Sequence, residues 1–238
     1  MLLIPGFFAG DWMMASMAGW LRRTGYRPYL SGIDWNVGCP ARKIELLDWR
    51  SEQIFRETDS PLTIIGHSLG GVFARSIAIK HPERIRQIVM LGTPGRMEPW
   101  AGIRAEWRAA MGLLRGLSCA FQPASPHCET PLCACDFMLS AKAFPSGVRC
   151  ASIYSRSDEI IDWRSCVDPL GENYEVSGGH LSLPINPGVY RLIAAILGNG
   201  AAADTGSEVA ALPSDSRDSE RPTRSTSSRR RYTPGSPA

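Results

Sequence analysis

The feature that most constrains the fold is the ten-residue stretch at 62–71, LTIIGHSLGG. Its first four residues are apolar and partly β-branched, as in a buried strand, and an apolar helical pattern follows it. The turn between strand and helix requires very small residues two places before and after the serine, and Gly66 and Gly70 satisfy this. We interpret Ser68 as a nucleophile at the carboxyl end of a strand, beside a helix N-terminus that favours a developing anion. An ordinary serine in a glycine-rich turn is the alternative.

The rest of the chain alternates between strand-type and helix-type apolar patterns at short spacing. We predict strands at residues 1–4, 27–33, 62–65, 85–91, 147–154 and 173–176, and helices at residues 12–23, 41–57, 72–80 and 187–197. This alternation is typical of an α/β fold, with a mostly parallel sheet, helices on both faces and right-handed crossovers.

The alternation is interrupted between residues 95 and 146 and stops near residue 198. We predict that 95–146 is an insertion that forms a cap or lid, with an amphipathic helix near 100–114 and a short helix near 136–144. Residues 199–238 have too few large apolar side chains to offset the entropy of ordering, so we expect a disordered tail. The chain is then one domain, residues 1–198, followed by that tail.

Composition argues against several classes of function. Apolar residues make up 44% and charged residues 21% of the chain, and the net charge of +3 is too small to indicate a nucleic-acid partner. No apolar stretch is long enough to cross a bilayer, so we expect no integral membrane segment. The N-terminal stretch MLLIPGFFAGDWMM has no early basic residue, and Pro5, Gly6 and Asp11 interrupt its apolar run. This argues against a signal peptide and favours a cytoplasmic location.

The cysteines argue against a disulfide framework, because the chain has seven of them, an odd number, and they are mostly scattered. Cys128, Cys133 and Cys135 lie close to His127 in the sequence and offer one candidate metal site. They lack the second C-x-x-C pair that is typical of zinc sites, so we interpret them as free thiols and expect no bound metal.

A serine hydroxyl needs an adjacent base to act as a nucleophile, and that base is expected to be a histidine held by a carboxylate. The chain has four histidines. His67 adjoins the serine but points away from it by chain geometry, His81 lies at a helix end, and His127 lies in the irregular insertion. His180 lies in a glycine-rich loop after the last predicted strand, at the same edge of the sheet as the serine. We predict that His180 is the base and that His67 is a packing residue.

The acid is expected between Ser68 and His180 in the sequence. Asp158 directly follows a predicted buried strand, which places it in a loop at the carboxyl end of the sheet, and we predict that it is the acid. The second choice for the acid is Asp162. We interpret Asp162, and likewise Glu159, Asp168 and Asp136, as solvated or capping carboxylates.

Attack by Ser68 on an acyl carbon produces an oxyanion, which needs two N–H donors. One is expected from the backbone of Leu69, the residue after the nucleophile. The other is expected from Phe7, in the loop after the first strand, where Gly6 lets the backbone come close. The rings of Phe7 and Phe8 are candidates for the wall of an acyl pocket, and core packing is the alternative.

Five segments, in this order along the chain, resemble motifs of the α/β-hydrolase family, in particular of its bacterial lipase- and esterase-like members: LLIPGF, GHSLGG, VMLGTP, IYSRSDEIID and SGGHLSL. The resemblance spans residues 1 to about 197. It implies a catalytic triad of Ser68, Asp158 and His180, with Phe7 and Leu69 as the oxyanion donors. It implies no metal ion and no organic cofactor.

Two departures from the family pattern are visible. Pro5-Gly6 stands where many members have His-Gly, and the first two strands of the family's sheet are missing. The chain is then a fragment, has a misassigned start, or has a trimmed sheet that begins at the family's third strand.

Together these features favour a serine hydrolase of the esterase or lipase type, which cleaves carboxylic esters through an acyl-enzyme on Ser68. The aromatic and apolar residues of the 95–146 insertion favour a small-molecule acyl ester of apolar character. The same triad also serves acyl transfer and amide cleavage. A catalytically inactive hydrolase fold that only binds a partner is the non-enzymatic alternative.

Overall fold

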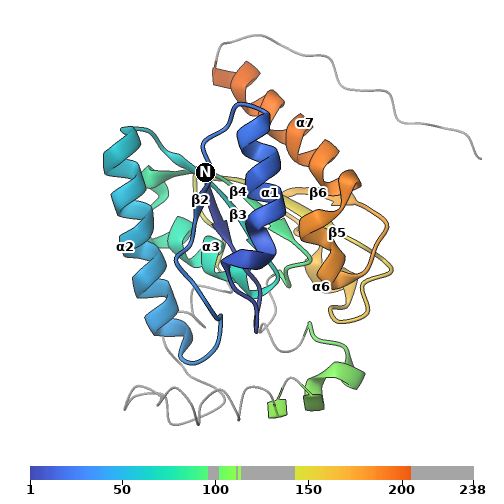
Figure 1. The fold of residues 1–238 in the computed structure, drawn as a ribbon. Coiled ribbons are helices and arrows are strands. Elements are labelled where there is room, and N and C mark those ends of the chain that lie inside the picture. Colours follow the sequence, from blue (N-terminus) through green and yellow to red (C-terminus); the bar gives the residue numbers. More distant parts are fainter. Residues whose placement is uncertain (96–101, 111, 114–142, 205–238) are drawn as a thin grey trace, which may run out of the picture.

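The computed structural model describes residues 1–95, 102–110, 112–113 and 143–204 (Figure 1). Its described strands form one sheet in the order β2-β1-β3-β4-β5-β6, and every neighbouring pair is parallel. The strands are β1 (Leu2–Ile4), β2 (Tyr29–Leu30), β3 (Leu62–His67), β4 (Ile85–Leu91), β5 (Arg149–Tyr154) and β6 (Glu172–Glu175). The prediction of a parallel α/β sheet is therefore confirmed.

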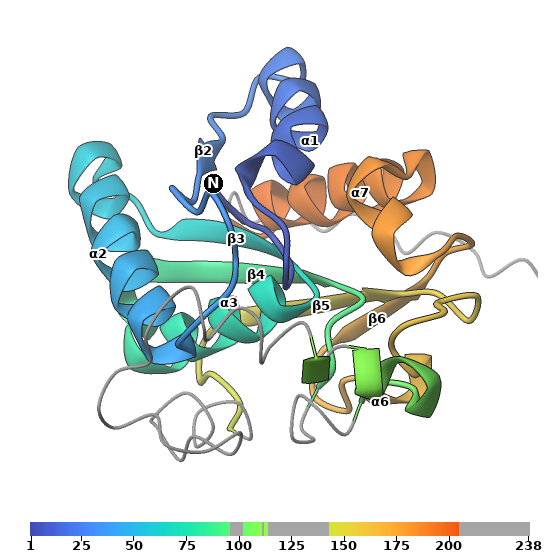
Figure 2. The ribbon, with the colours of Figure 1, turned by 60° about the horizontal axis from the view of Figure 1, so that its bottom comes forward.

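Helices cover both faces of the sheet. Helices α1 (Asp11–Arg23) and α7 (Pro187–Asp204) lie on one face, and α2 (Pro40–Thr58) and α3 (Leu69–Lys80) lie on the other (Figures 1 and 2). Because successive side chains of a strand point to opposite faces, each strand contributes to two cores. In β1, Leu2 and Ile4 join the cluster of α2 and α3, whereas Leu3 joins that of α1 and α7.

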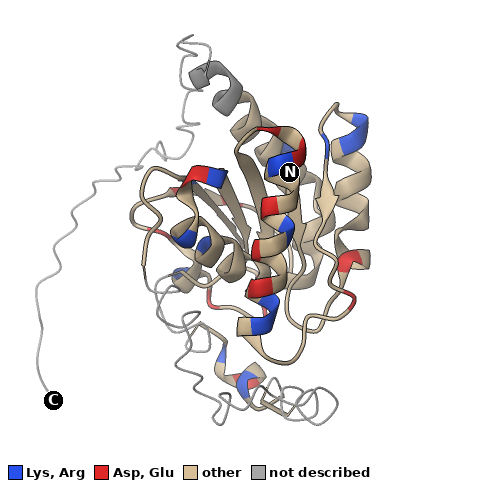
Figure 3. Cartoon of the chain, turned by 90° about the vertical axis from the view of Figure 1, so that its left-hand side faces the viewer, with Lys and Arg blue, Asp and Glu red and all other residues tan. Residues whose placement is uncertain are grey.

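Helix α2 shows how the sequence pattern places a helix on the sheet. Ile44, Leu47 and Ile54 recur at helical spacing and are buried against the sheet. The helix begins with Pro40, where a missing N–H costs no hydrogen bond, and ends before Asp59, which has a φ of +47°. Residues of both charge signs are interspersed along the helix (Figure 3).

The junction of β3 and α3 depends on glycines because the backbones approach so closely. A Cβ atom on Gly66 would lie 2.5 Å from the backbone of Gly70, and one on Gly70 would lie 2.4 Å from the carbonyl oxygen of Ile4. A methyl group at either position has no room, so the start of α3 packs directly against the ends of β3 and β1.

Helix α3 carries a buried arginine that the sequence analysis did not anticipate. Arg75 is 1% exposed, and its guanidinium donates to the carbonyl oxygen of Gly95 at 2.6 Å. It also faces Asp168, 3.9 Å away and equally buried. Asp168 was expected to be solvated or to cap a helix, and the first of these is wrong, because the cation of α3 offsets the cost of burying the carboxylate.

Several boundaries differ from the prediction. The strand expected at 27–33 is reduced to Tyr29–Leu30, because Pro28 has no N–H and Gly32, at a φ of +82°, turns the chain. The last helix runs on to Asp204, beyond its predicted end at 197. Three short helices were not predicted as such: η1 (Pro82–Arg84), α6 (Trp163–Cys166) and η2 (His180–Ile185).

The predicted insertion is described only in part. Residues 105–110 are helical, within the amphipathic helix expected near 100–114. Ile103 forms an antiparallel bridge with Ile161, which ties this segment to the loop after β5. The short helix expected near 136–144 falls almost wholly outside the described residues, and the expected tail does so from residue 205 onward. No helix in the described part of the chain is long and apolar enough to cross a membrane.

Candidate active site

Ser68 lies at the turn between β3 and α3 in a strained backbone conformation. Its φ is +51° and its ψ is −119°, which a non-glycine residue rarely adopts. Three hydrogen bonds hold its backbone there. The Ser68 N–H donates to the carbonyl oxygen of Leu91 at 2.8 Å, and its own carbonyl accepts from Gly71 N–H at 3.0 Å and from the Thr93 hydroxyl at 3.1 Å. These three hydrogen bonds stabilise an otherwise unfavourable backbone conformation. The conformation places Ser68 at the carboxyl end of the sheet.

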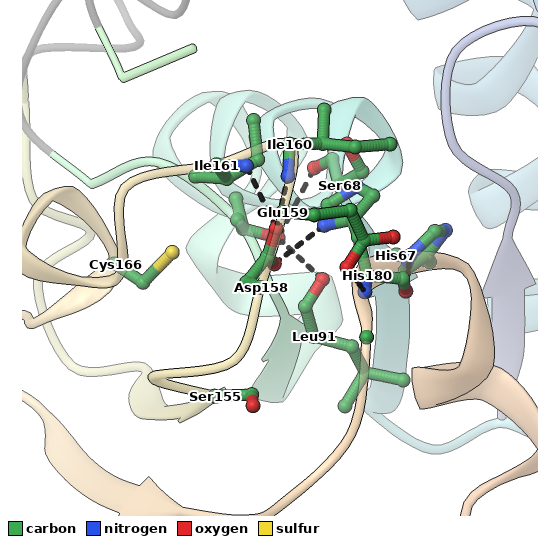
Figure 4. Close-up of polar contacts among 12 residues, drawn as sticks. His67, Ser68, Leu91, Ser155, Asp158, Glu159, Ile160, Ile161, Cys166 and His180 are labelled. Carbon is green, nitrogen blue, oxygen red and sulfur yellow. Dashed lines mark hydrogen bonds and ion pairs between the residues drawn. The ribbon is translucent and has the colours of Figure 1, made fainter. Parts of the chain in front are cut away.

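His180 and Asp158 form a buried pair at the same edge of the sheet (Figure 4). Nδ1 of His180 lies 2.6 Å from Oδ2 of Asp158, and each residue is 3% exposed. Because an ionised carboxylate only accepts hydrogen bonds, Nδ1 carries the proton and Nε2 keeps a free lone pair. The imidazole therefore has the tautomer that a general base requires.

The loop after β5 fixes the orientation of Asp158. Its other oxygen, Oδ1, accepts from the backbone N–H groups of Ile160 at 2.9 Å and Ile161 at 2.7 Å (Figure 4). Its own N–H donates to the carbonyl oxygen of Ser155 at 3.2 Å. With one oxygen occupied by two backbone donors, the other is left to face His180.

The pair also depends on Gly92, directly after β4. Gly92 has a φ of +54°, and a Cβ on it would lie 3.1 Å from Nδ1 of His180 and 3.2 Å from Oδ2 of Asp158. Ser68 bonds to Leu91, the residue before Gly92, so the serine and the pair flank the same strand end. In the described part of the chain, the Ser68 hydroxyl makes no hydrogen bond to His180; in unliganded sites such bonds are commonly long and tighten when substrate binds.

His67 lies in the core behind the pair, as predicted for a packing residue. Its ring centroid is 4.8 Å from that of His180, and its Nε2 lies 3.1 Å from the carbonyl oxygen of His180. A carbonyl only accepts, so Nε2 of His67 carries the proton. Burial, together with the nearby His180, lowers the pKa of His67 to about 3, which keeps its ring neutral.

The two residues proposed to donate to an oxyanion flank the serine. Leu69 is the first residue of α3, where backbone N–H groups have no partner within the helix. Phe7 follows Gly6, and a Cβ on Gly6 would lie 3.1 Å from Cβ of Ser68, so this loop runs close beside the serine. Asn36 braces the loop by donating to the carbonyl oxygen of Pro5 at 2.9 Å.

The rings at positions 7 and 8 differ in their surroundings. Phe7 is half-buried, whereas Phe8 is 42% exposed and has a φ of +60°. The Phe8 ring meets Trp35 edge-on at 5.4 Å, and Trp35 is exposed too. Core packing therefore does not account for Phe8.

Of the remaining histidines, His81 is described and lies in a different environment. Nε2 of His81 lies 3.2 Å from Asp48, and its Nδ1 lies 3.3 Å from Glu83, in a surface cluster that links α2 to η1. His127 lies outside the described residues, with Cys128, Cys133, Cys135 and Asp136. Among the residues that are described, no three His, Cys, Asp or Glu side chains converge in a way that would hold a metal ion.

The alternative carboxylates have other partners. Asp162 caps α6 by accepting from the Arg164 N–H at 3.0 Å, which agrees with the capping role expected for it. Glu159 is exposed, and its Oε2 accepts from the backbone N–H of His180 at 3.0 Å. No sequence pattern indicated a role for Glu159 at the site. Its position directly after Asp158 was the one available signal.

Comparisons with known proteins agree with this architecture. A family model described as alpha/beta hydrolase fold matches residues 58–117. The chain is 47% identical over 38 residues to a homoserine O-acetyltransferase of Thermus thermophilus, which is 16% of this chain and 10% of that protein. It is 28% identical over 93 residues to a pimeloyl-[acyl-carrier protein] methyl ester esterase of Aromatoleum aromaticum, which is 39% of this chain and 36% of that protein. The match thus spans a tenth of the first relative's length and little more than a third of the second's.

Among solved structures, the mature lipase BlEst2 of Bacillus licheniformis superposes with a TM-score of 0.61 at 13% identity, over 82% of this chain and 90% of that chain. The matched family model, this superposition and the order of the parallel strands agree. The chain therefore has the α/β-hydrolase fold, which confirms the fold class predicted from its motifs.

Proposed function

We propose that this α/β-hydrolase-fold protein is a serine hydrolase that cleaves carboxylic esters through an acyl-enzyme on Ser68. The observation that carries the proposal is the buried pair of His180 and Asp158, 2.6 Å apart, beside a serine held at a φ of +51°. A strained serine turn and an oriented imidazole at one sheet edge are the parts that acyl transfer to a serine requires.

In the proposed mechanism, Nε2 of His180 takes the Ser68 proton as the serine oxygen attacks the acyl carbon. Asp158 stabilises the imidazolium that forms, and the N–H groups of Leu69 and Phe7 bind the oxyanion. His180 then gives the proton to the leaving alcohol, which yields an ester on Ser68. A water molecule then attacks the acyl carbon and gives a proton to His180. His180 passes this proton to the Ser68 oxygen, and the carboxylic acid leaves. The groups involved all come from this chain.

The proposed substrate is a small apolar acyl ester. Two exposed aromatic side chains, Phe8 and Trp35, support an apolar substrate, because Phe8 directly follows the proposed oxyanion donor Phe7 and its ring contacts that of Trp35. The similarity to the esterase of Aromatoleum aromaticum, whose name describes it as acting on a methyl ester, also supports ester cleavage.

Hydrolysis of p-nitrophenyl butyrate by the wild type and by Ser68→Ala tests the proposal. The wild type is expected to turn over the ester and to be labelled covalently by a fluorophosphonate probe, whereas Ser68→Ala does neither. Equal turnover by the two proteins would reject Ser68 as the nucleophile. A folded wild type that neither hydrolyses the ester nor reacts with the probe would favour the inactive, partner-binding alternative.

Acyl transfer is the second candidate, favoured by the 38-residue match to an O-acetyltransferase. The same acyl-enzyme would then pass its acyl group to an alcohol or thiol instead of water. Turnover of p-nitrophenyl acetate with added alcohols and thiols distinguishes the two. A rise in p-nitrophenol release with an acylated acceptor as product indicates transfer, and release of acetate alone indicates hydrolysis.

A further inference from the structure

His180 is the first residue of η2, and the loop that leads to it is rich in glycine. Two glycines precede it, and Gly178 has a φ of +133°. The loop's own hydrogen bonds, from Ser182 at 2.7 Å and Asn186 at 2.6 Å, end on carbonyls of the same loop. They shape the loop, but they do not set its distance from the serine or from the acid.

The N–H side of the His180 peptide is held by the loop that carries the acid. Oε2 of Glu159 accepts from the backbone N–H of His180 at 3.0 Å (Figure 4). A Cβ on Gly179 would lie 2.7 Å from that oxygen, so the glycine is what lets the carboxylate reach the backbone. Glu159 directly follows Asp158, which binds the ring of the same histidine.

The carbonyl side is held by the strand that carries the serine. Nε2–H of His67 donates to the His180 carbonyl oxygen at 3.1 Å, and both residues are buried (Figure 4). His67 directly precedes Ser68. Because burial keeps the pKa of His67 low, its ring stays neutral and adds no positive charge beside an imidazolium at His180.

We propose that Glu159 and His67 are positioning residues, which hold the His180 peptide from both sides and so set the base relative to the serine and the acid. The proposal rests on the proposed function of the site. Each of the two residues is the chain neighbour of a catalytic candidate, so the two bonds connect the base directly to the segments of Asp158 and Ser68. A misplacement of about 1 Å in such a site costs roughly a hundredfold in rate.

Variants of Glu159 carry the test, because this side chain is exposed and its loss leaves the core intact. With p-nitrophenyl butyrate, Glu159→Ala is expected to lower kcat by about 10- to 100-fold with little change in KM. The rate of fluorophosphonate labelling falls with it, since labelling requires an activated serine but no deacylation by water. Glu159→Gln is expected to restore kcat to within about threefold of the wild type, because its amide oxygen still accepts the N–H.

Glu175→Ala is the matched control. Glu175 is also an exposed carboxylate at this end of the sheet, but it pairs with Arg156 at 3.0 Å, so we expect kcat and labelling to stay at the wild-type level. At the buried position, His67→Gln retains a donor near Nε2, whereas His67→Phe retains the ring shape without a donor. The first is expected to keep more of kcat than the second, with thermal melting used to compare only folded proteins.

A kcat within twofold of the wild type for Glu159→Ala would overturn the proposal. The proposal would equally be overturned if kcat of Glu159→Gln were as low as that of Glu159→Ala. The negative charge of Glu159, rather than its hydrogen bond, would then account for the loss of kcat. Failure of the proposed function looks different: the wild type is not labelled, or Ser68→Ala is as active as the wild type. If the wild type is labelled normally and Glu159→Ala keeps the kcat of the wild type, only the positioning role is rejected.

Discussion

Replacing Asp158 by asparagine exchanges one oxygen for an amide nitrogen, and the structure indicates which oxygen. Oδ1 accepts from the N–H groups of Ile160 at 2.9 Å and Ile161 at 2.7 Å. The NH₂ group of an amide can only donate, so the amide oxygen must remain with these two donors. The amide nitrogen then faces Nδ1 of His180. In the wild type this place is taken by the acceptor Oδ2, 2.6 Å from Nδ1.

The consequence is a change of tautomer at His180. Nδ1 must now accept, so the ring proton moves to Nε2, which can no longer take a proton from Ser68. Loss of the correct tautomer in a serine triad lowers kcat by about 10⁴-fold, which corresponds to about 5.4 kcal/mol at ~1.36 kcal/mol per factor of ten. Both backbone N–H groups keep their acceptor, so the free energy of unfolding is expected to fall by only about 1–2 kcal/mol.

Initial rates with p-nitrophenyl butyrate and urea unfolding check the two halves of this prediction. Asp162→Asn is the matched control, since Asp162 also accepts a backbone N–H, from Arg164, and its amide would still cap α6. We expect near-wild-type kcat for the control. If Asp158→Asn retained more than about a tenth of wild-type kcat while Ser68→Ala were inactive, the tautomer argument would be refuted.

Two further predictions concern stability. Gly92→Ala is expected to lower kcat and to cost about 2–4 kcal/mol of unfolding free energy in urea, because its φ is +54° and the new Cβ would lie 2.8 Å from Leu183 and 3.1 Å from Nδ1 of His180. The control is Gly147→Ala, at a φ of +73° with no atom within 4 Å of the new Cβ. It is expected to cost about 1 kcal/mol of unfolding free energy and to leave kcat unchanged. Equal losses of unfolding free energy in both variants would contradict the steric argument. The pKa of His67 is lowered from 6.5 to about 3 in the fold, so its contribution to stability is complete above pH 6.5 and is lost as the pH falls towards 3, by roughly 1.4 kcal/mol per unit. Urea unfolding at pH 7 and pH 5 should therefore show a smaller pH effect in His67→Phe than in the wild type, and the same effect in both would count against the neutral buried ring.

Sequence patterns predicted most of the scaffold because each element carries its own local signal. The apolar runs of β3 and β4, the amphipathic α2 and the glycines around Ser68 each depend on residues within one short segment. Predictions were weaker where local signals compete. The strand at 27–33 was overestimated, since the tie from Asp11 to the backbone of Ser31 and Gly32 diverts the chain there.

Within the candidate site, the sequence predicted which side chains lie at one edge of the sheet but not the contacts that hold them there. Asp158 and His180 were chosen by their places after strands, and the structure brings them together at 2.6 Å. The contacts of Glu159 and Arg75 were not predicted. No sequence pattern indicates the partner of a glutamate in a polar loop or of an arginine in an apolar helix. The catalytic roles of Ser68, Asp158 and His180, like those of the oxyanion donors, stay predictions for the experiments above.

The sequence by itself determined the strand–turn–helix around Ser68, because only glycine fits its tight turn, and it determined the α/β alternation, because hydrophobic period selects helix or strand locally. The tertiary structure alone decided that His67 and Glu159 meet opposite sides of the His180 peptide, and that Arg75 meets Asp168. Those contacts join residues far apart in the chain. Their existence depends on how strand ends and loops pack against one another, and no local propensity encodes that packing.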